Sequence, residues 1–232
     1  MCGRFTLSVS KNEIKDYLYK NYQIEEFDSN FMVPRYNIAP GQELITIIND
    51  GSKHRIGTIK WGFVPFFAKD EKIGFKMINA KAETLSEKLS FRNSFKHKRC
   101  VILADGFYEW KKENNTKIPM RFLLKNQTIF LFAGIWSSYK REDGSTLYTC
   151  SIITTNANSL VSTVHDRMPV ILTNETKDIW LNPNIKDDKV LSSLLIPYQA
   201  DEMKGYQVST IVNNPTNEDP KCILATEQFN LN

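Results

Sequence analysis

Short apolar segments separated by turn residues dominate the middle of the chain and are the feature that most limits its fold. The segments are RCVILADGFYEW, IPMRFLLK, TIFLFAGIW and LYTCSIITT, and the residues DG, NN, KNQ and EDGS interrupt them. Several short strands with turn signals between them are typical of antiparallel sheets. The pattern therefore predicts an antiparallel meander that closes into a curved sheet or barrel.

Helix and hairpin signals surround this predicted sheet. Asp50-Gly51 separates ELITIIND from HRIGTIKWGFV, and this dipeptide between β-branched and aromatic runs predicts a hairpin. Capping boxes at 10–13 and 84–87 predict two helices, the first ending near Asn21 and the second continuing through FRNSF. Helical spacing recurs in ETKDIWL and DDKVLSSLL, and the first residues are expected to form a strand or an extended arm. Residues 21–43 end in PRYNIAPGQ, whose prolines and glycine predict irregular structure.

The composition is that of a folded protein without a strong charge bias. Of the 232 residues, 41% are hydrophobic, which is enough to bury a sizeable core. The chain has no internal repeat or linker, so we expect an α+β fold. It would be a single domain over residues 1–232, with a curved, barrel-like, mostly antiparallel sheet surrounded by short helices. The net charge of +4 permits an anionic partner, and no apolar run approaches the roughly 18 residues of a membrane span.

The four cysteines do not form a metal-binding or disulfide pattern. They are Cys2, Cys100, Cys150 and Cys222, with no CxxC pair and no histidine at the spacing of a metal ligand. We therefore expect no metal and no cofactor. With no secretory segment at its start, the chain is expected to be a reduced protein of the cytoplasm. Cys2 remains unusual, because a chain terminus is loosely ordered and a cysteine there oxidises readily.

Three further segments carry reactive side chains that a purely structural role does not explain. INAKAET brings Asn79 and Lys81 to the junction of a predicted strand and helix, where polar side chains can face a ligand. ADGFYEWKK places Glu109 between two aromatic residues. Glu109 is either a solvent-facing strand residue or an acid/base group whose pKa these neighbours raise. VHDRMPVIL contains His165, which belongs either to a surface turn or to a catalytic site.

The segment WGFVPFF offers several aromatic side chains close to a proline. Most of Trp61, Phe63, Phe66 and Phe67 are expected in the core, while an exposed one could stack on a nucleic-acid base.

Nine segments together resemble one protein family in their order and spacing. They are MCGRF, YNIAPGQ, WGFVP, NAKAET, FRNSF, RCVILADGFYEWKK, AGIW, VHDRMPVIL and VSTIVNNP, and they extend over nearly the whole chain. The chain resembles the SOS response-associated peptidase family, the abasic-site processing proteins that crosslink themselves to damaged single-stranded DNA. This resemblance implies an α+β fold around a barrel-like sheet, with a groove that binds single-stranded DNA.

The resemblance also implies roles for individual residues. The family's catalytic positions fall on Cys2, Asn79, Glu109 and His165. Its DNA-contacting positions fall on Arg4, Asn37, Pro40, Trp61, Lys81 and Arg167. Bacterial relatives often carry arginine where this chain has Lys81, and lysine keeps the charge but loses the bidentate fork for phosphate. The implied partner is single-stranded DNA with abasic sites, with replication-fork or repair proteins as further partners. A monomer is expected, associated with the nucleoid if its source is bacterial.

Removal of Met1 would give Cys2 a free α-amine next to its thiol. The α-amine has a reference pKa of about 7.8, so about 14% of it is unprotonated at pH 7, against about 0.04% of a lysine amine. Its attack on the aldehyde of an opened abasic sugar gives an imine, and addition of the neighbouring thiol closes a stable thiazolidine ring. Glu109 and His165 would move the protons, and Asn79 would hold the thiol or a sugar hydroxyl.

The sequence leaves two other functions open. In the first, Cys2 is the nucleophile of an N-terminal cysteine peptidase that removes at least Met1 from itself. In the second, the protein binds single-stranded DNA without catalysis, and the reactive side chains are structural.

Overall fold

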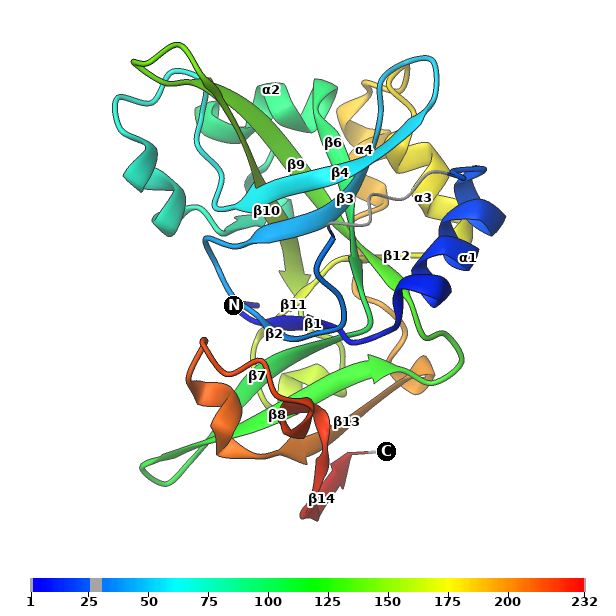
Figure 1. The fold of residues 1–232 in the computed structure, drawn as a ribbon, viewed down its shortest axis with the longest axis vertical. Coiled ribbons are helices and arrows are strands. Elements are labelled where there is room, and N and C mark those ends of the chain that lie inside the picture. Colours follow the sequence, from blue (N-terminus) through cyan, green and yellow to red (C-terminus); the bar gives the residue numbers. More distant parts are fainter. Residues whose placement is uncertain (1, 26–30, 232) are drawn as a thin grey trace.

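Two β-sheets contain the strands of the computed structural model, which describes residues 2–25 and 31–231 (Figure 1). The first sheet has six strands, each antiparallel to its neighbours. In spatial order they are β14 (Ala225–Leu231), β13 (Met203–Val208), β8 (Thr116–Leu124), β7 (Gly106–Glu113), β1 (Phe5–Leu7) and β2 (Arg35–Ile38). Figure 1 shows this sheet below the second one, with β1 and β2 near the junction.

The second sheet closes into a barrel. Its strands follow the order β11 (Arg167–Pro169), β10 (Thr146–Asn156), β4 (His54–Trp61), β3 (Glu43–Asn49), β6 (Arg99–Ala104), β9 (Phe130–Lys140) and β12 (Ile171–Leu172). Because β10 also pairs with β9, the five strands from β10 to β9 form a closed ring. Only β4 and the short β5 (Asn79–Lys81) run parallel to β10 among the described pairings. The structure confirms the predicted α+β fold with a curved, barrel-like, mostly antiparallel sheet.

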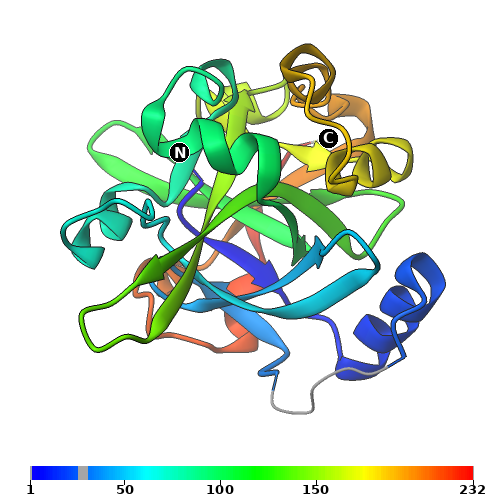
Figure 2. The ribbon, with the colours of Figure 1, turned by 90° about the horizontal axis from the view of Figure 1, so that it is seen from above.

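Short helices lie around the two sheets (Figure 2). The α-helices are α1 (Lys11–Tyr22), α2 (Leu89–His97), α3 (Asn174–Leu181) and α4 (Asp188–Ser193). The 3₁₀ turns are η1 (Glu71–Lys76), η2 (Ala82–Thr84), η3 (Val161–Thr163), η4 (Ala200–Glu202), η5 (Thr210–Asn213) and η6 (Pro220–Ile223). The predicted hairpin is confirmed as β3 and β4, and the last two predicted helices are confirmed as α3 and α4.

The two predicted capping boxes have different outcomes. At α1 the Ser10 hydroxyl accepts from the backbone N–H of Glu13, whose carboxylate accepts from the N–H of Ser10, as predicted. The second box is wrong, because α2 begins only at Leu89 and its N-cap residue makes no side-chain hydrogen bond. Pairing of β5 with β10 keeps the chain extended through Lys81, and the turn η2 then occupies the predicted helix start.

The prediction of irregular structure over residues 21–43 is wrong for one part of that range. Strand β2 forms there, and its Ile38 pairs with Phe5 of β1. The two prolines of this segment, Pro34 and Pro40, lie outside β2, so they bound the strand without interrupting its hydrogen bonds. Residues 26–30 of the predicted irregular stretch lie outside the described residues.

The segment RCVILADGFYEW is two strands that belong to different sheets. β6 lies in the barrel and β7 lies in the six-stranded sheet, with Asp105 between them. The buried Asp105 carboxylate accepts from the hydroxyls of Thr6 and Ser8 at 2.5 Å and from the N–H of Ser8 at 2.7 Å. It also lies 3.4 Å from the guanidinium of Arg121. This network attaches β1 to the point where the chain changes sheets.

Aromatic side chains join the two sheets in one core. The ring of Phe5 makes edge contacts with Trp61 and Phe132 of the barrel, at 5.4 Å and 5.5 Å between ring centres. Phe107 of β7 stacks on Phe122 at 5.3 Å and also contacts Phe132. The start of the chain is therefore held by the core on both sides. In the described part of the chain, every helix is too short or too polar to cross a membrane.

Candidate functional site

Cys2 is fixed just before β1 by contacts from both sheets. Its carbonyl accepts a hydrogen bond of 2.7 Å from the side-chain amide of Asn79 on β5. The next residues pair with β7, where the N–H of Tyr108 donates to the carbonyl of Arg4. The Cys2 side chain has no exposed surface, and burial raises the pKa of its thiol above the usual range, with the charge of Glu109 adding to the rise. The thiol is therefore protonated at neutral pH.

Glu109 and His165 line one pocket with a volume of about 440 Å³. The other described residues around it are Arg4, Trp110, Lys112, Lys117 and Asn213. Glu109 on β7 is only 3% exposed, so the interpretation of it as a solvent-facing residue is wrong. Burial raises the pKa of its carboxyl to about 7. A carboxyl with this pKa exchanges its proton readily at neutral pH, as an acid/base group requires.

His165 lies half-buried two residues before the short strand β11. Its Nδ1 accepts a hydrogen bond of 3.0 Å from the backbone N–H of Arg167, so the proton of the neutral ring is on Nε2. Burial lowers the pKa of the imidazole, which favours this neutral form. Nδ1 also lies 2.9 Å from the largely exposed carboxylate of Asp166. Because a protonated Nδ1 must donate, protonation would exchange the backbone contact for this carboxylate.

Arg4 is held by Asn37 and by the 3₁₀ turn η5. One guanidinium nitrogen donates to the side-chain oxygen of Asn37 and to the carbonyl of Val212, both at 2.7 Å. Asn37 is fully buried, and its amide nitrogen donates to the carbonyls of Val212, Asn214 and Asn217. Direct DNA contact, which the resemblance implied for Asn37, does not fit this placement, because the side chain is enclosed.

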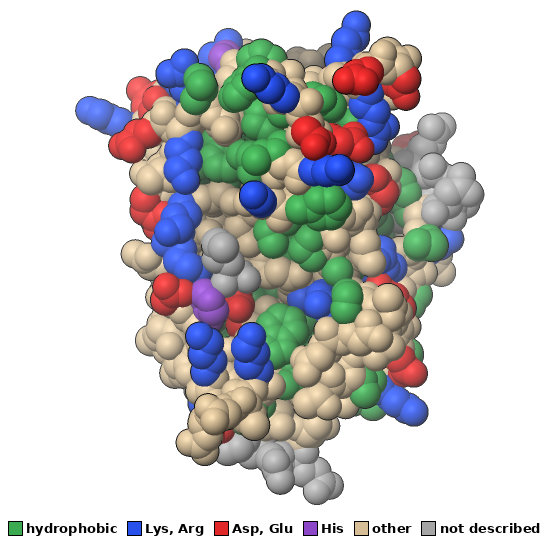
Figure 3. Space-filling view, turned by 90° about the vertical axis from the view of Figure 1, so that its left-hand side faces the viewer, with side chains coloured by type: hydrophobic (Ala, Val, Ile, Leu, Met, Phe, Trp, Pro, Cys, Tyr) green, Lys and Arg blue, Asp and Glu red, His purple; other side chains and the backbone are tan. Residues whose placement is uncertain are grey.

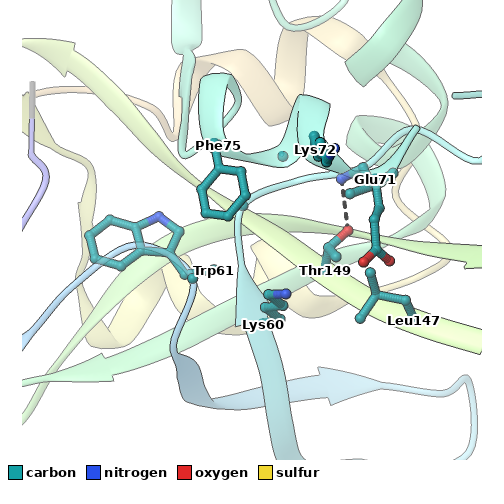
Figure 4. A pocket seen from close by; sticks show the side chains of 11 residues that line it. Lys60, Trp61, Glu71, Lys72, Phe75, Leu147 and Thr149 are labelled. Carbon is teal, nitrogen blue, oxygen red and sulfur yellow. Dashed lines mark hydrogen bonds between the residues drawn. The ribbon is translucent and has the colours of Figure 1, made fainter. Parts of the chain in front are cut away.

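Trp61 is a core residue in this structure. It is 1% exposed, and its Nε1 donates to the carbonyl of Ile78 at 2.8 Å. A ring in this position has no free face for a base, so direct stacking by Trp61 does not fit its burial. It borders a second pocket of about 230 Å³, in which Figure 4 shows Phe75 near Trp61 and Thr149 and Leu147 further along. Pro40 is half-buried beside Gly41, which also lines this pocket.

Two exposed aromatic side chains lie on the loop that follows Trp61. Phe66 is 64% exposed and Phe67 is 46% exposed, and their rings contact each other edge to face. Figure 3 shows the face on the left of Figure 1, where apolar side chains gather between groups of Lys and Arg. Phe66 and Phe67 are therefore exposed, as the prediction of stacking on a nucleic-acid base requires.

Lys81 and Arg167 have opposite environments. Lys81 is exposed at the end of β5. The buried Arg167 forms a two-pronged ion pair with Glu83 at 2.7 Å and 2.9 Å, and it also donates to Asn156 and to the carbonyl of Thr154. This hydrogen bonding lowers the pKa of the Glu83 carboxyl. Arg167 is thus neutralised within the protein, whereas Lys81 is available to a ligand.

The catalytic set predicted from the sequence comes from both sheets. Glu109 lies on β7 of the six-stranded sheet and Cys2 lies just before its strand β1, while Asn79 lies on β5 and His165 just before β11 of the barrel sheet. Sequence reasoning missed Lys112, Lys117 and Asn213. The runs KK and VNNP could have indicated Lys112 and Asn213, but no motif marks Lys117. Within residues 2–25 and 31–231, no three His, Cys, Asp or Glu side chains gather as metal ligands would. All four cysteines are free and buried.

Comparisons with known proteins found relatives that match almost the whole chain. A family model described as SOS response associated peptidase (SRAP) matches residues 1–215. The abasic site processing protein YoqW of Bacillus subtilis (strain 168) is 53% identical over 225 residues, which cover 96% of this chain and 99% of YoqW. The abasic site processing protein HMCES of Xenopus tropicalis is 28% identical over 264 residues, covering 97% of this chain and 78% of HMCES.

The fold has a close counterpart among solved structures. A crystal structure of a protein from Bacteroides thetaiotaomicron has a TM-score of 0.86 and 28% identity, and the match covers 97% of this chain and 100% of that one. Since the family model matches most of the chain and YoqW is similar over almost its whole length, the chain belongs to the SOS response associated peptidase (SRAP) family.

Proposed function

We propose that this protein processes abasic sites in single-stranded DNA and that Cys2, after loss of Met1, forms a covalent thiazolidine crosslink with the lesion. The observation that carries the proposal is the position of Glu109, with a carboxyl pKa of about 7, close enough to Cys2 for its charge to act on the thiol. The names of the relatives support the substrate class. The crosslink would shield the lesion from strand cleavage.

The proposed reaction uses both groups of the aminothiol. The α-amine of Cys2 attacks C1′ of the open-chain sugar, and the resulting carbinolamine loses water to give an imine. The thiol sulfur then bonds to C1′ while its proton passes to the imine nitrogen, which closes a five-membered ring. This second step is fast because the thiol is tethered next to the carbon that it attacks. No oxidant or cofactor is required, and reversal of the same steps releases the DNA.

Three side chains would support these steps. Glu109 takes the proton of the C1′ hydroxyl on ring opening and returns it to the ring oxygen O4′. It then carries the amine protons to the oxygen that departs as water, and relays the thiol proton to the imine nitrogen. His165, neutral with Nε2 protonated, donates a hydrogen bond to a sugar oxygen. Asn79 holds the Cys2 carbonyl, and its buried side-chain oxygen has no hydrogen-bond partner among the described residues. An acceptor left in this state costs about 1–3 kcal/mol, which a hydrogen bond from the new amine would recover.

DNA binding would combine charge with stacking. We propose that Arg4 and Lys81 contact phosphates, that Arg167 does so once Glu83 releases it, and that Phe66 and Phe67 stack on bases. One copy of the chain is sufficient for a one-to-one adduct, so we propose a monomer that acts in the cytoplasm or on the nucleoid. Contacts with replication-fork or repair proteins stay a prediction.

The decisive test is adduct formation with an oligonucleotide that contains one abasic site. The Met1-free protein should give a species that survives denaturation and is shifted on a gel. Cys2→Ala should give none, and Cys2→Ser should give at most a labile imine, because a hydroxyl replaces the thiol. A heat-stable adduct with Cys2→Ala would refute the thiazolidine. Intact mass spectrometry checks the premise, since retained Met1 would rule out the aminothiol.

The same proteins separate the two alternative functions. Hydrolysis of peptides that depends on Cys2 would favour the peptidase, although a buried thiol with a raised pKa is a poor thiolate nucleophile. Binding of DNA that is unchanged in Cys2→Ala, together with no covalent species from the wild type, would favour a non-catalytic binding protein.

A further inference from the structure

Two lysines face each other across the hairpin of β7 and β8. Lys112 and Lys117 are directly opposite in the antiparallel register, and both side chains are exposed. Residues in this relation have Cβ atoms about 4.5–5.5 Å apart, and like charges placed there destabilise the strand pair. This arrangement therefore costs folding free energy unless an anion binds between the two ammonium groups.

No carboxylate of the described residues lies within ion-pair distance, 4.0 Å, of either lysine. Glu113, which follows Lys112 in β7, instead lies 3.8 Å from the ammonium of Lys111. The repulsion between Lys112 and Lys117 is thus not relieved by an ion pair in the described protein.

Both lysines line the pocket that contains Glu109 and His165. Among the described residues around this pocket, Glu109 carries the one carboxylate, whereas Arg4 and the two lysines carry positive charge. Arg4 is already bound to Asn37 and Val212. Arg4 keeps its charge but is partly enclosed by these neutral partners, whereas Lys112 and Lys117 are exposed at the pocket. A backbone phosphate of bound DNA is an anion that the two lysines can bind.

We propose that Lys112 and Lys117 form a phosphate clamp, which binds one DNA phosphate next to the abasic sugar and so holds the sugar over Glu109. The clamp rests on the proposed function, because it positions the same substrate. Its contribution is independent of base sequence, since it contacts only the backbone. It makes the hairpin of β7 and β8 a positioning element for the reaction.

The clamp can be measured without the crosslinking chemistry. A stable tetrahydrofuran analogue of the abasic site cannot form an imine, so fluorescence anisotropy with this single-stranded DNA reports binding alone. Lys112→Ala combined with Lys117→Ala should weaken binding about tenfold and make the slope of log affinity against log salt about 1.4 units shallower. Lys125→Ala removes one positive charge just beyond the other end of β8 and should change affinity less than twofold.

A methylphosphonate is an uncharged replacement for a DNA phosphate. Placing it at one linkage at a time identifies the phosphate that the two lysines bind. At one linkage beside the analogue, it should weaken the wild type about tenfold and leave the double variant unchanged, because the same contact is already lost. If the methylphosphonate and the double substitution weaken binding independently at every linkage, so that their fold-changes in affinity multiply, the clamp is refuted.

Each lysine variant should melt at or above the wild-type temperature, because a like-charge repulsion is removed. An unchanged affinity in a folded double variant refutes the clamp alone, whereas failed crosslinking by wild type refutes the proposed function.

Discussion

Glu109 is the residue whose environment determines most about the proposed chemistry. Its carboxyl is buried on β7, and desolvation raises its pKa from 4.5 to about 7. In the folded protein the carboxyl keeps its proton to a higher pH than in the unfolded chain. The free energy of unfolding therefore falls as pH rises from 4.5 to 7, by as much as roughly 3 kcal/mol. Burial of Glu109 therefore lowers the free energy of unfolding at neutral pH, and it also gives the protein a carboxyl that titrates there.

Glu109→Gln should separate these two effects. We expect the rate of adduct formation by the wild type to rise through pH 7 as Glu109 loses its proton. The variant should be slower by about 100-fold and should keep only the later rise, near pH 8, from the α-amine. Single-turnover gel assays from pH 5 to 9 measure both.

The stability of Glu109→Gln is the control for this measurement. At pH 8 the variant should be at least as stable as the wild type, because a neutral amide replaces a buried carboxylate. Formation and reversal of the adduct at wild-type rates across this pH range would show that Glu109 is not the proton shuttle.

Strand β1 is the element that positions Cys2. It has only three residues, so its own backbone pairing contributes little, and side-chain contacts with Asp105 hold it in place. The same carboxylate lies beside the buried guanidinium of Arg121. Asp105 therefore connects the start of the chain, the turn between the two sheets and strand β8.

Asp105→Ala should destabilise the fold by about 3 kcal/mol, because the change leaves the Arg121 charge buried without its partner. Urea denaturation monitored by tryptophan fluorescence measures the loss. Adduct formation should slow in parallel under conditions where the variant remains folded, since β1 no longer fixes Cys2. Asp16→Ala removes an exposed carboxylate of α1 and serves as the control. A loss below about 1 kcal/mol for Asp105→Ala would contradict the role of this network.

The whole molecule presents its reactive groups where two sheets meet. Cys2 and Glu109 lie at or beside strands of one sheet, and Asn79 and His165 lie at or beside strands of the other, so the proposed site exists only when both sheets share their core. The net charge is only +4, and binding must depend on where the cations lie. Arg167 is already neutralised by Glu83, while Lys81, Lys112 and Lys117 are exposed.

This distribution predicts a moderate salt dependence for binding to single-stranded DNA. With about four phosphate contacts, from Arg4 and the three exposed lysines, log affinity should fall with log salt at a slope of about −3. Titration of Cys2→Ala with the tetrahydrofuran oligonucleotide at several salt concentrations measures it. A slope near zero would show that stacking, and not phosphate contact, supplies the affinity.

Much of the local structure could be predicted from the sequence because it depends on neighbouring residues. The capping box of Ser10 and Glu13 and the Asp50-Gly51 hairpin are satisfied within a few residues, and both are confirmed. The capping box at 84–87 failed because pairing of β5 with the distant β10 determines the chain path there. Local signals are reliable where no long-range pairing competes with them.

The residue types that the proposed chemistry needs were evident in the sequence, but their environments were not. A cysteine after Met1, a glutamate in GFYEW and a histidine in HDRMP can be read directly. Tertiary structure alone decided that Trp61 and Asn37 are enclosed, that Arg167 is paired with Glu83, and that Glu109 is buried. Burial and charge pairing arise from segments far apart in the chain. Sequence therefore determined which groups are present, and the packing of two sheets determined their accessibility, charge and pKa.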